Sequence, residues 1–305
     1  MTAKPASRQP FAPISATVGA RPRLDLRIFS RWLDVSGPVS RNELFVAVTA
    51  IGFMNGISER VASAVRDNGV VPAFLDTFNI SIVVWIAWAI GTVFLLRESR
   101  QPIERRDWIV VAVACAAFLI PVVPLSWLAL SGLAFHLLRT SQRSSFLNRG
   151  AWILLGITVP MFWSRIVFEM LSGFILEGDA ILVGWLVGTP RSGNAIQFAD
   201  GSGYLWIAPN CSSLANVSLA ILCWMTFIKV WERPATRWNI AWAALACMAV
   251  IAINVARISL MGLYPEYFDL IHGPIGATIA SWIILGVMVG TSLIGVQYDH
   301  RKAFV

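Results

Sequence analysis

The sequence predicts an all-α polytopic membrane protein with about eight transmembrane helices and a small extracytoplasmic β-hairpin. Hydrophobic residues make up 57% of the 305 residues and charged residues only 13%, about half of the roughly 25% typical of soluble domains. Long apolar runs recur along the chain, and most basic residues fall in alternate connections between them. The 14 tryptophans also suit a bilayer protein, because their amphipathic rings favour the boundary between water and lipid.

Eight apolar runs are expected to form the transmembrane helices, since about 20 apolar residues cross a hydrocarbon core of roughly 30 Å. The first run is short. Residues 108–138 are too long for one ordinary span and contain Pro121 and Pro124, which predicts a tight hairpin of two short helices. The eight runs cover residues 44–57, 78–96, 108–121, 124–138, 150–168, 212–231, 239–257 and 272–296.

Basic residues predict the orientation of these spans, because Lys and Arg concentrate in cytoplasmic segments. With both termini inside, only five of the 24 Lys and Arg residues fall in outer segments: Arg60, Arg66, Arg165, Arg191 and Arg257. A single span over 108–138 would break this alternation. The net charge of +7 is therefore interpreted as a topology signal, and no nucleic-acid partner is expected.

The predicted organisation is one membrane domain, residues 42–297, between two cytoplasmic tails. The N-terminal tail, residues 1–41, is basic, and the C-terminal tail covers residues 298–305. Residues 1–43 contain Arg and Pro but no apolar core, so we expect no cleavable signal peptide.

Four cysteines and three histidines give little support to a disulfide framework or a metal site. There is no Cys-x-x-Cys pair, the histidines are far apart, and no cofactor is expected. Cys115, Cys223 and Cys247 fall within spans, where cysteine packs as a small hydrophobe. Cys211 lies in an outer segment without an obvious disulfide partner.

The predicted topology brings three chemically capable side chains to one outer rim of the membrane. Cys211 stands where the sixth span begins, Arg257 where the seventh ends, and His272 where the eighth begins. A thiolate can attack a carbonyl, an imidazole can move protons, and a guanidinium can stabilise an oxyanion. The set therefore suits covalent acyl transfer.

Local sequence supports each of these roles. Asn210 is a plausible N-cap that would place Cys211 in the first helical turn, where the helix dipole favours a thiolate. Asn254 precedes Arg257 by three residues, so it shares a helix face with the arginine and could orient it. Pro274 suits a helix start, which places His272 just before the last span as a neutral base.

Each of these residues also has a structural alternative. Cys211 could be a small residue that starts a span, Arg257 a cation that complements a helix dipole, and His272 a polar anchor at the membrane surface. His136 and His300 are expected to be structural or solvated.

The outer segment before Cys211 is expected to contain a β-hairpin. Residues 194–200 and 204–207 have strand character, and the intervening Gly201-Ser202-Gly203 predicts a turn. The hairpin could cover the site, line a substrate cleft, or be a plain surface feature. Residues 166–176 could extend the fifth helix or lie along the surface.

The order Cys, Asn-x-x-Arg and His on successive outer helix ends resembles the exosortase/archaeosortase family. Its members are membrane-embedded cysteine proteases and transpeptidases. The resemblance covers roughly residues 40–297, with most weight on 203–276, and it implies that Cys211 is the nucleophile, Arg257 the essential arginine and His272 the histidine. The family has Cys-Ser-Gly where this chain has Cys211-Ser212-Ser213, which leaves the subfamily and the exact sorting signal open.

The resemblance also implies a substrate class and a location. The family cleaves membrane-anchored proteins that end in a sorting signal, called PEP-CTERM proteins in bacteria: a short motif, an apolar helix and a basic tail. It implies the bacterial inner membrane, an active site on the periplasmic side and a link to exopolysaccharide production. Hydrolysis or transfer, the acceptor and the oligomeric state stay open.

Two other functions are compatible with the sequence. A transporter or exopolysaccharide-export component would suit eight spans interrupted by Gly and Pro, but the two halves show no visible repeat and acids deep in spans are scarce. In a non-catalytic assembly partner, the rim residues would only anchor the chain. Either of these proteins should tolerate Cys211→Ala, whereas a cysteine peptidase should not.

Overall fold

The computed structural model describes residues 38–234 and 236–302, and most of these residues are helical. Most of the predicted N-terminal tail, residues 1–41, lies outside the described residues. The predicted C-terminal tail, 298–305, begins within the last helix, which continues to Lys302.

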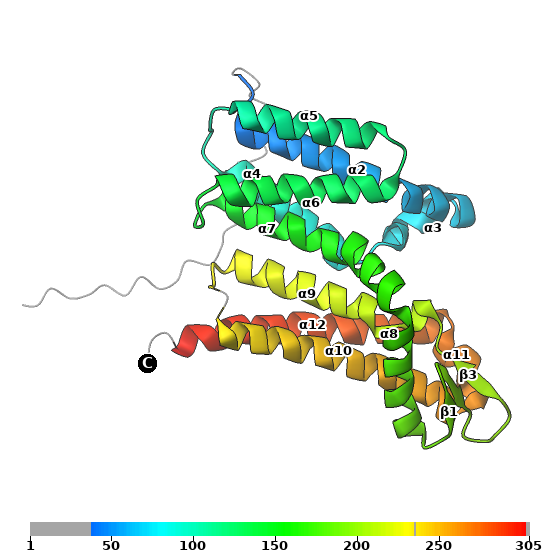
Figure 1. The fold of residues 1–305 in the computed structure, drawn as a ribbon. Helices are drawn as coiled ribbons and strands as arrows, with labels where there is room; N and C mark the ends of the chain where they lie inside the picture. Colours follow the sequence, from blue (N-terminus) through cyan, green and yellow to red (C-terminus); the bar gives the residue numbers. More distant parts are fainter. Residues whose placement is uncertain (1–37, 235, 303–305) are drawn as a thin grey trace, which may run out of the picture. The chain divides into compact units, whose positions relative to one another are not determined.

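Each of the eight apolar runs coincides with a helix, which confirms the all-α class (Figure 1). Within the described residues, four helices are long and apolar enough to cross a membrane, consistent with a membrane protein: α2, α9, α10 and, as far as Gln297, α12. The helices are α2 (Arg41–Asn68), α3 (Val70–Leu75), α4 (Ile82–Arg97), α5 (Arg105–Leu119), α6 (Val123–Thr140), α7 (Phe146–Thr158), α8 (Ser164–Val187), α9 (Ser213–Val230), α10 (Arg237–Leu263), α11 (Phe268–His272) and α12 (Pro274–Lys302).

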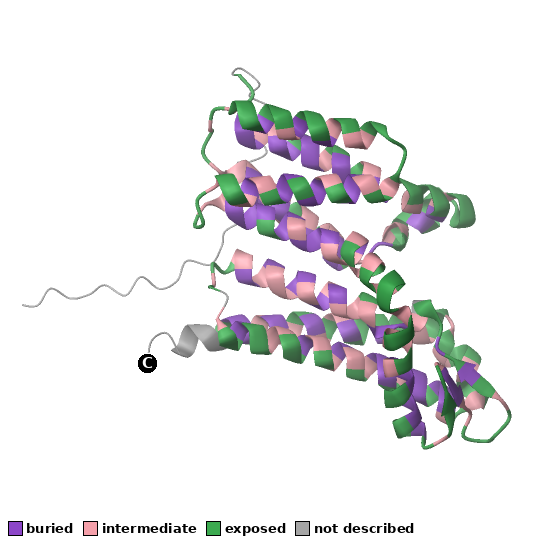
Figure 2. Cartoon of the chain, in the orientation of Figure 1, coloured by how far each residue is buried: buried purple, intermediate pink, exposed green. Residues whose placement is uncertain are grey.

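Two glycines, Gly91 and Gly150, allow α4 and α7 to approach closely near the start of α7. A Cβ atom at Gly150 would lie 2.9 Å from the carbonyl oxygen of Gly91, so no larger residue fits there without movement. Small residues of this kind let helix backbones pack closely in membrane proteins. Around this contact the helices turn their buried faces inward, with a core that includes Phe53, Leu95 and Ile153 (Figure 2).

The starts of α2, α5 and α7 and the ends of α6 and α9 lie at one end of the fold, which we call the basic end. Charged side chains connect several of these helix ends by hydrogen bonds. Arg41 donates to Asp107 from Nε at 2.8 Å and from Nη2 at 3.0 Å, and the ring Nε2 of His136 lies 2.8 Å from the same carboxylate. Arg149 donates to the carbonyl oxygens of Lys229 and Val230 near the end of α9.

The chain between α7 and α8 changes direction without leaving the helical state. Residues Val159–Trp163 form a π-helical segment that contains Pro160, whose missing N–H favours such an irregularity. A second kink follows at Leu171, where φ is −124°. Residues 166–176 therefore continue the helix predicted for residues 150–168 and form part of α8. This helix runs across the ends of its neighbours rather than along them (Figure 1).

A small antiparallel sheet follows α8 and marks the opposite, sheet end of the fold. Its order is β1 (Arg191–Ser192), β2 (Ala195–Gln197) and β3 (Tyr204–Trp206), which confirms the predicted hairpin and adds an unpredicted first strand. Gly201, at φ +72°, permits the turn, and Asp200 accepts a hydrogen bond from the Ser202 amide. Ile196 is fully buried against α8 and α10, so the hairpin is packed onto helices.

Candidate active site at the sheet end

Cys211 lies just outside α9, in a short turn that the sequence did not predict. Residues Pro209–Cys211 form one turn of 3₁₀ helix, closed by a hydrogen bond from the Cys211 amide to the Ala208 carbonyl. The N-cap of α9 is Ser212, whose Oγ accepts from the Leu214 amide at 3.2 Å. The prediction that Asn210 caps this helix, with Cys211 in its first turn, is therefore wrong, because Ser212 takes the cap.

Asn254 in α10 holds the backbone on both sides of that cap. Its Nδ2 donates to the Cys211 carbonyl oxygen at 2.8 Å and to the Ser213 Oγ at 3.1 Å. The asparagine is buried, so both bonds are shielded from water. Cys211 itself is half-buried, and its side chain packs against the apolar cluster beneath the sheet.

Asp179 in α8 completes this polar cluster and was missed by the sequence reasoning. Its Oδ2 accepts from the Ser213 amide at 3.0 Å and its Oδ1 from the Ser213 Oγ at 2.8 Å, while the residue is only 5% exposed. A carboxylate at a helix N-terminus is favoured by the helix dipole. Its signal in the sequence is an acidic residue directly before the apolar run 180–187.

Arg257 lies within α10, one helical turn after Asn254. Its Nε and Nη2 donate to the Ile271 carbonyl oxygen at 3.3 and 3.1 Å, and Nη2 also donates to the His272 carbonyl oxygen at 3.2 Å. The guanidinium thus satisfies the last carbonyl groups of α11, as cations often do at helix C-termini.

His272 is the last residue of α11 and is exposed. Its ring stacks on Phe268 with centroids 5.2 Å apart and planes within 7°. Phe268 in turn meets Phe198 of the hairpin edge-on, at 6.5 Å. Among the described residues, neither ring nitrogen of His272 has a hydrogen-bond partner.

Two neighbouring turns of α10 therefore hold the chain segments that carry the other two candidate residues. Asn254 binds the backbone at Cys211, and Arg257 binds the backbone at His272. No hydrogen bond or ion pair joins the three candidate side chains to one another within the described part of the chain. The predicted residues lie at one end of the fold as neighbours and do not form a hydrogen-bonded triad.

An apolar pocket opens beside Arg257. It encloses about 320 Å³ between α10, α11 and α12, and Arg257 is the one charged residue among those that line it. Its walls include Leu260, Leu270, Ile275 and Ile279. No cluster of three or more His, Cys, Asp or Glu side chains suited to a metal ion occurs in the described ranges.

The chain matches no family model, and comparisons with curated proteins and with solved structures find no significant similarity.

Proposed function

We propose that this protein is a membrane-embedded cysteine peptidase or transpeptidase that cleaves the C-terminal sorting signals of membrane-anchored exported proteins. The chain crosses the bacterial inner membrane eight times in this proposal, with both termini inside and the sheet end on the periplasmic side. The exosortase/archaeosortase resemblance supplies the substrate class.

The topology is supported by the separation of charge along the helices. Residues that the charge pattern assigns to the inner side, among them Arg41, Arg139, Arg149 and Lys229, stand at helix ends of the basic end. Arg66 lies in the last turn of α2, away from the basic end, and Arg191 lies in β1 at the sheet end. A positive bias toward one side is typical of the cytoplasmic face.

One observation carries the proposed chemistry: α10 binds the backbone at Cys211 through Asn254 and the backbone at His272 through Arg257. A thiol, a guanidinium and an imidazole thereby stand on adjoining segments of one end. The His272 nitrogens are unoccupied, as a proton carrier requires. The apolar pocket beside Arg257 suits the apolar segment that follows a scissile bond.

The reaction begins when the Cys211 thiol gives its proton to His272 and the sulfur attacks the carbonyl carbon of the scissile peptide bond. Arg257 stabilises the negative charge on the carbonyl oxygen, for which its guanidinium must turn from the α11 carbonyls. The C–N bond then breaks, the leaving amine takes the proton from His272, and the substrate is left as a thioester on Cys211. Water or an acceptor amine resolves the thioester and restores the thiol.

The test uses an exported reporter that ends in a short sorting motif, an apolar helix and a basic tail. The reporter is co-expressed with wild type, with Cys211→Ala or with Cys115→Ala, at matched membrane abundance, and its C-terminus is read by mass spectrometry. Wild type and Cys115→Ala should process the reporter, whereas Cys211→Ala should not, because it lacks the nucleophile.

The non-catalytic assembly role keeps one structural argument in its favour, since Arg257 already serves as a cap for α11. The same assay separates the two functions. Full processing by Cys211→Ala would remove the enzyme proposal and leave the assembly role ahead.

A further inference from the structure

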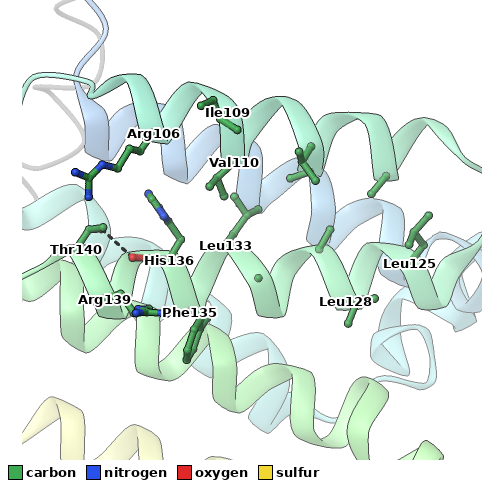
Figure 3. A pocket seen from close by; sticks show the side chains of 15 residues that line it. Arg106, Ile109, Val110, Leu125, Leu128, Leu133, Phe135, His136, Arg139 and Thr140 are labelled. Carbon is green, nitrogen blue, oxygen red and sulfur yellow. Dashed lines mark hydrogen bonds between the residues drawn. The ribbon is translucent and has the colours of Figure 1, made fainter.

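A long groove runs between α5 and α6, remote from the candidate active site. It encloses about 890 Å³, and every residue that lines it belongs to one of these two helices or to their ends (Figure 3). On the lipid-facing side of a membrane protein, such a groove is open to acyl chains.

Most of the groove is apolar and matches the depth of one membrane leaflet. The lining residues from Leu125 to His136 span a length of roughly 17 Å along α6, because an α-helix rises about 1.5 Å per residue. The hydrocarbon of one leaflet is roughly 15 Å thick, half of the full core. A Cβ atom at Gly132 would meet nothing within 4 Å, so the floor is open at that point.

Unpaired cations close the groove at the basic end. Arg106 of α5 and Arg139 of α6 line it there, together with His136 (Figure 3). Both arginines are exposed, and neither forms an ion pair with any described carboxylate, although the Arg139 guanidinium rests 5.6 Å from the Phe135 ring centre. The nearby Asp107 is only 1% exposed and is already engaged by Arg41 and His136.

We propose that this groove binds an anionic phospholipid of the inner leaflet, with an acyl chain along α5 and α6 and the phosphate between Arg106 and Arg139. Charge complementarity selects this occupant. A substrate helix with a basic tail would place cations against the two arginines, and a second copy about a two-fold axis would bring the same arginines toward each other. The inference uses the proposed topology but not the proposed chemistry.

The head-group test compares phosphatidylglycerol with phosphatidylcholine of identical palmitoyl and oleoyl chains, added in equal amounts to purified protein in detergent. Native mass spectrometry counts the retained lipids. Wild type should retain phosphatidylglycerol in preference, by about five-fold for each arginine, which corresponds to about 1 kcal/mol each. Arg106→Ala with Arg139→Ala should lose this preference. Arg105→Ala, which removes a charge beside the groove without lining it, should keep it.

The acyl-chain test fills the groove instead of changing its charge. Gly132→Leu places a side chain in the open floor of the groove and should reduce retention of both lipids several-fold. The helix should still form, because leucine is a better helix former than glycine. Gly286→Leu in α12, where a Cβ also meets nothing within 4 Å, should retain lipid as wild type does.

Three results would overturn the proposal. They are equal retention of the two lipids by wild type, an undiminished preference in the double arginine variant, and unchanged retention by Gly132→Leu. A dimer that is lost in Gly132→Leu would assign the groove to a second copy of the chain. Reporter processing plays no part in these readouts, so this proposal and the proposed function fail separately.

Discussion

The two ends of the fold use similar side chains in opposite ways. At the basic end, Asp107 receives Arg41 and His136, so charged groups satisfy one another. At the sheet end, Asn254 and Arg257 bind backbone oxygens, while no hydrogen bond in the described region reaches the His272 ring. A satisfied buried ion cluster joins helices and has no capacity left for a ligand. At the sheet end, backbone contacts hold the segments that carry Cys211 and His272, and the His272 ring has no hydrogen-bond partner among the described residues.

The largest effect on folding should come from the basic end. Asp107→Ala leaves Arg41 buried without its carboxylate, because the two side chains are 1% and 5% exposed, and should lower the free energy of unfolding by about 3–5 kcal/mol. Denaturant titration in detergent measures this change in the free energy of unfolding. Glu177→Ala, which breaks the exposed pair with Arg191, should cost less than about 1 kcal/mol. Equal costs for the two variants would contradict the structural role of the buried cluster.

Arg257→Lys should have the next largest effect, and on activity. A lysine offers a point charge in place of the planar fork that reaches two carbonyl oxygens, so reporter processing should fall by about 100-fold. Arg191→Lys, at an exposed ion pair, is the matched control and should process normally. Normal processing by Arg257→Lys would count against a catalytic arginine.

Two buried asparagines in opposite halves of α10, Asn239 and Asn254, give a direct comparison. Asn254→Ala releases the Cys211 carbonyl and should reduce processing about tenfold through loss of positioning. Asn239→Ala releases the Pro234 carbonyl at the basic end and should leave processing per folded molecule unchanged. Each should cost about 1–3 kcal/mol of stability. Equal losses of processing would mean that Asn254 acts only through stability.

Ser213→Gly should have the smallest effect. It removes the hydroxyl that donates to Asp179 and accepts from Asn254, for a loss of about 1–2 kcal/mol in stability. It also restores the Cys-Ser-Gly order of the resembled family, so processing should stay within about three-fold of wild type. A complete loss would show that the polar contact of Ser213 with Asp179 sets the geometry at Cys211.

Features that depend on local pattern could be predicted from the sequence. Apolar runs located the helices, and Gly201 with its flanking residues located the hairpin, because hydropathy and turn chemistry act over a few residues. The placement of Cys211, Arg257 and His272 at one end of the fold followed from the alternation of spans.

Features that depend on competition between neighbours could not be predicted. Asn210 and Ser212 are both good cap residues, and the turn at Pro209–Cys211 leaves the cap to Ser212. The role of Asp179 depends on α8 crossing the start of α9, which follows from the π-helical segment and the kink at Leu171. Pro160 favours an irregularity in the first segment but does not predict its π-helical form, and no local pattern predicts the kink at Leu171.

In the proposed membrane placement, the hydrogen bonds of α10 have a consequence for how the sheet end responds to the surrounding lipid. The segments before α9 and before α12 are both fastened to this one helix, at positions three residues apart, or roughly 4.5 Å along the axis. A change in bilayer thickness is accommodated by helix tilt. In that placement, a tilt of α10 moves the segment at Cys211 and the segment at His272 together. The height of both segments in the membrane can therefore change while the distance between them stays constant.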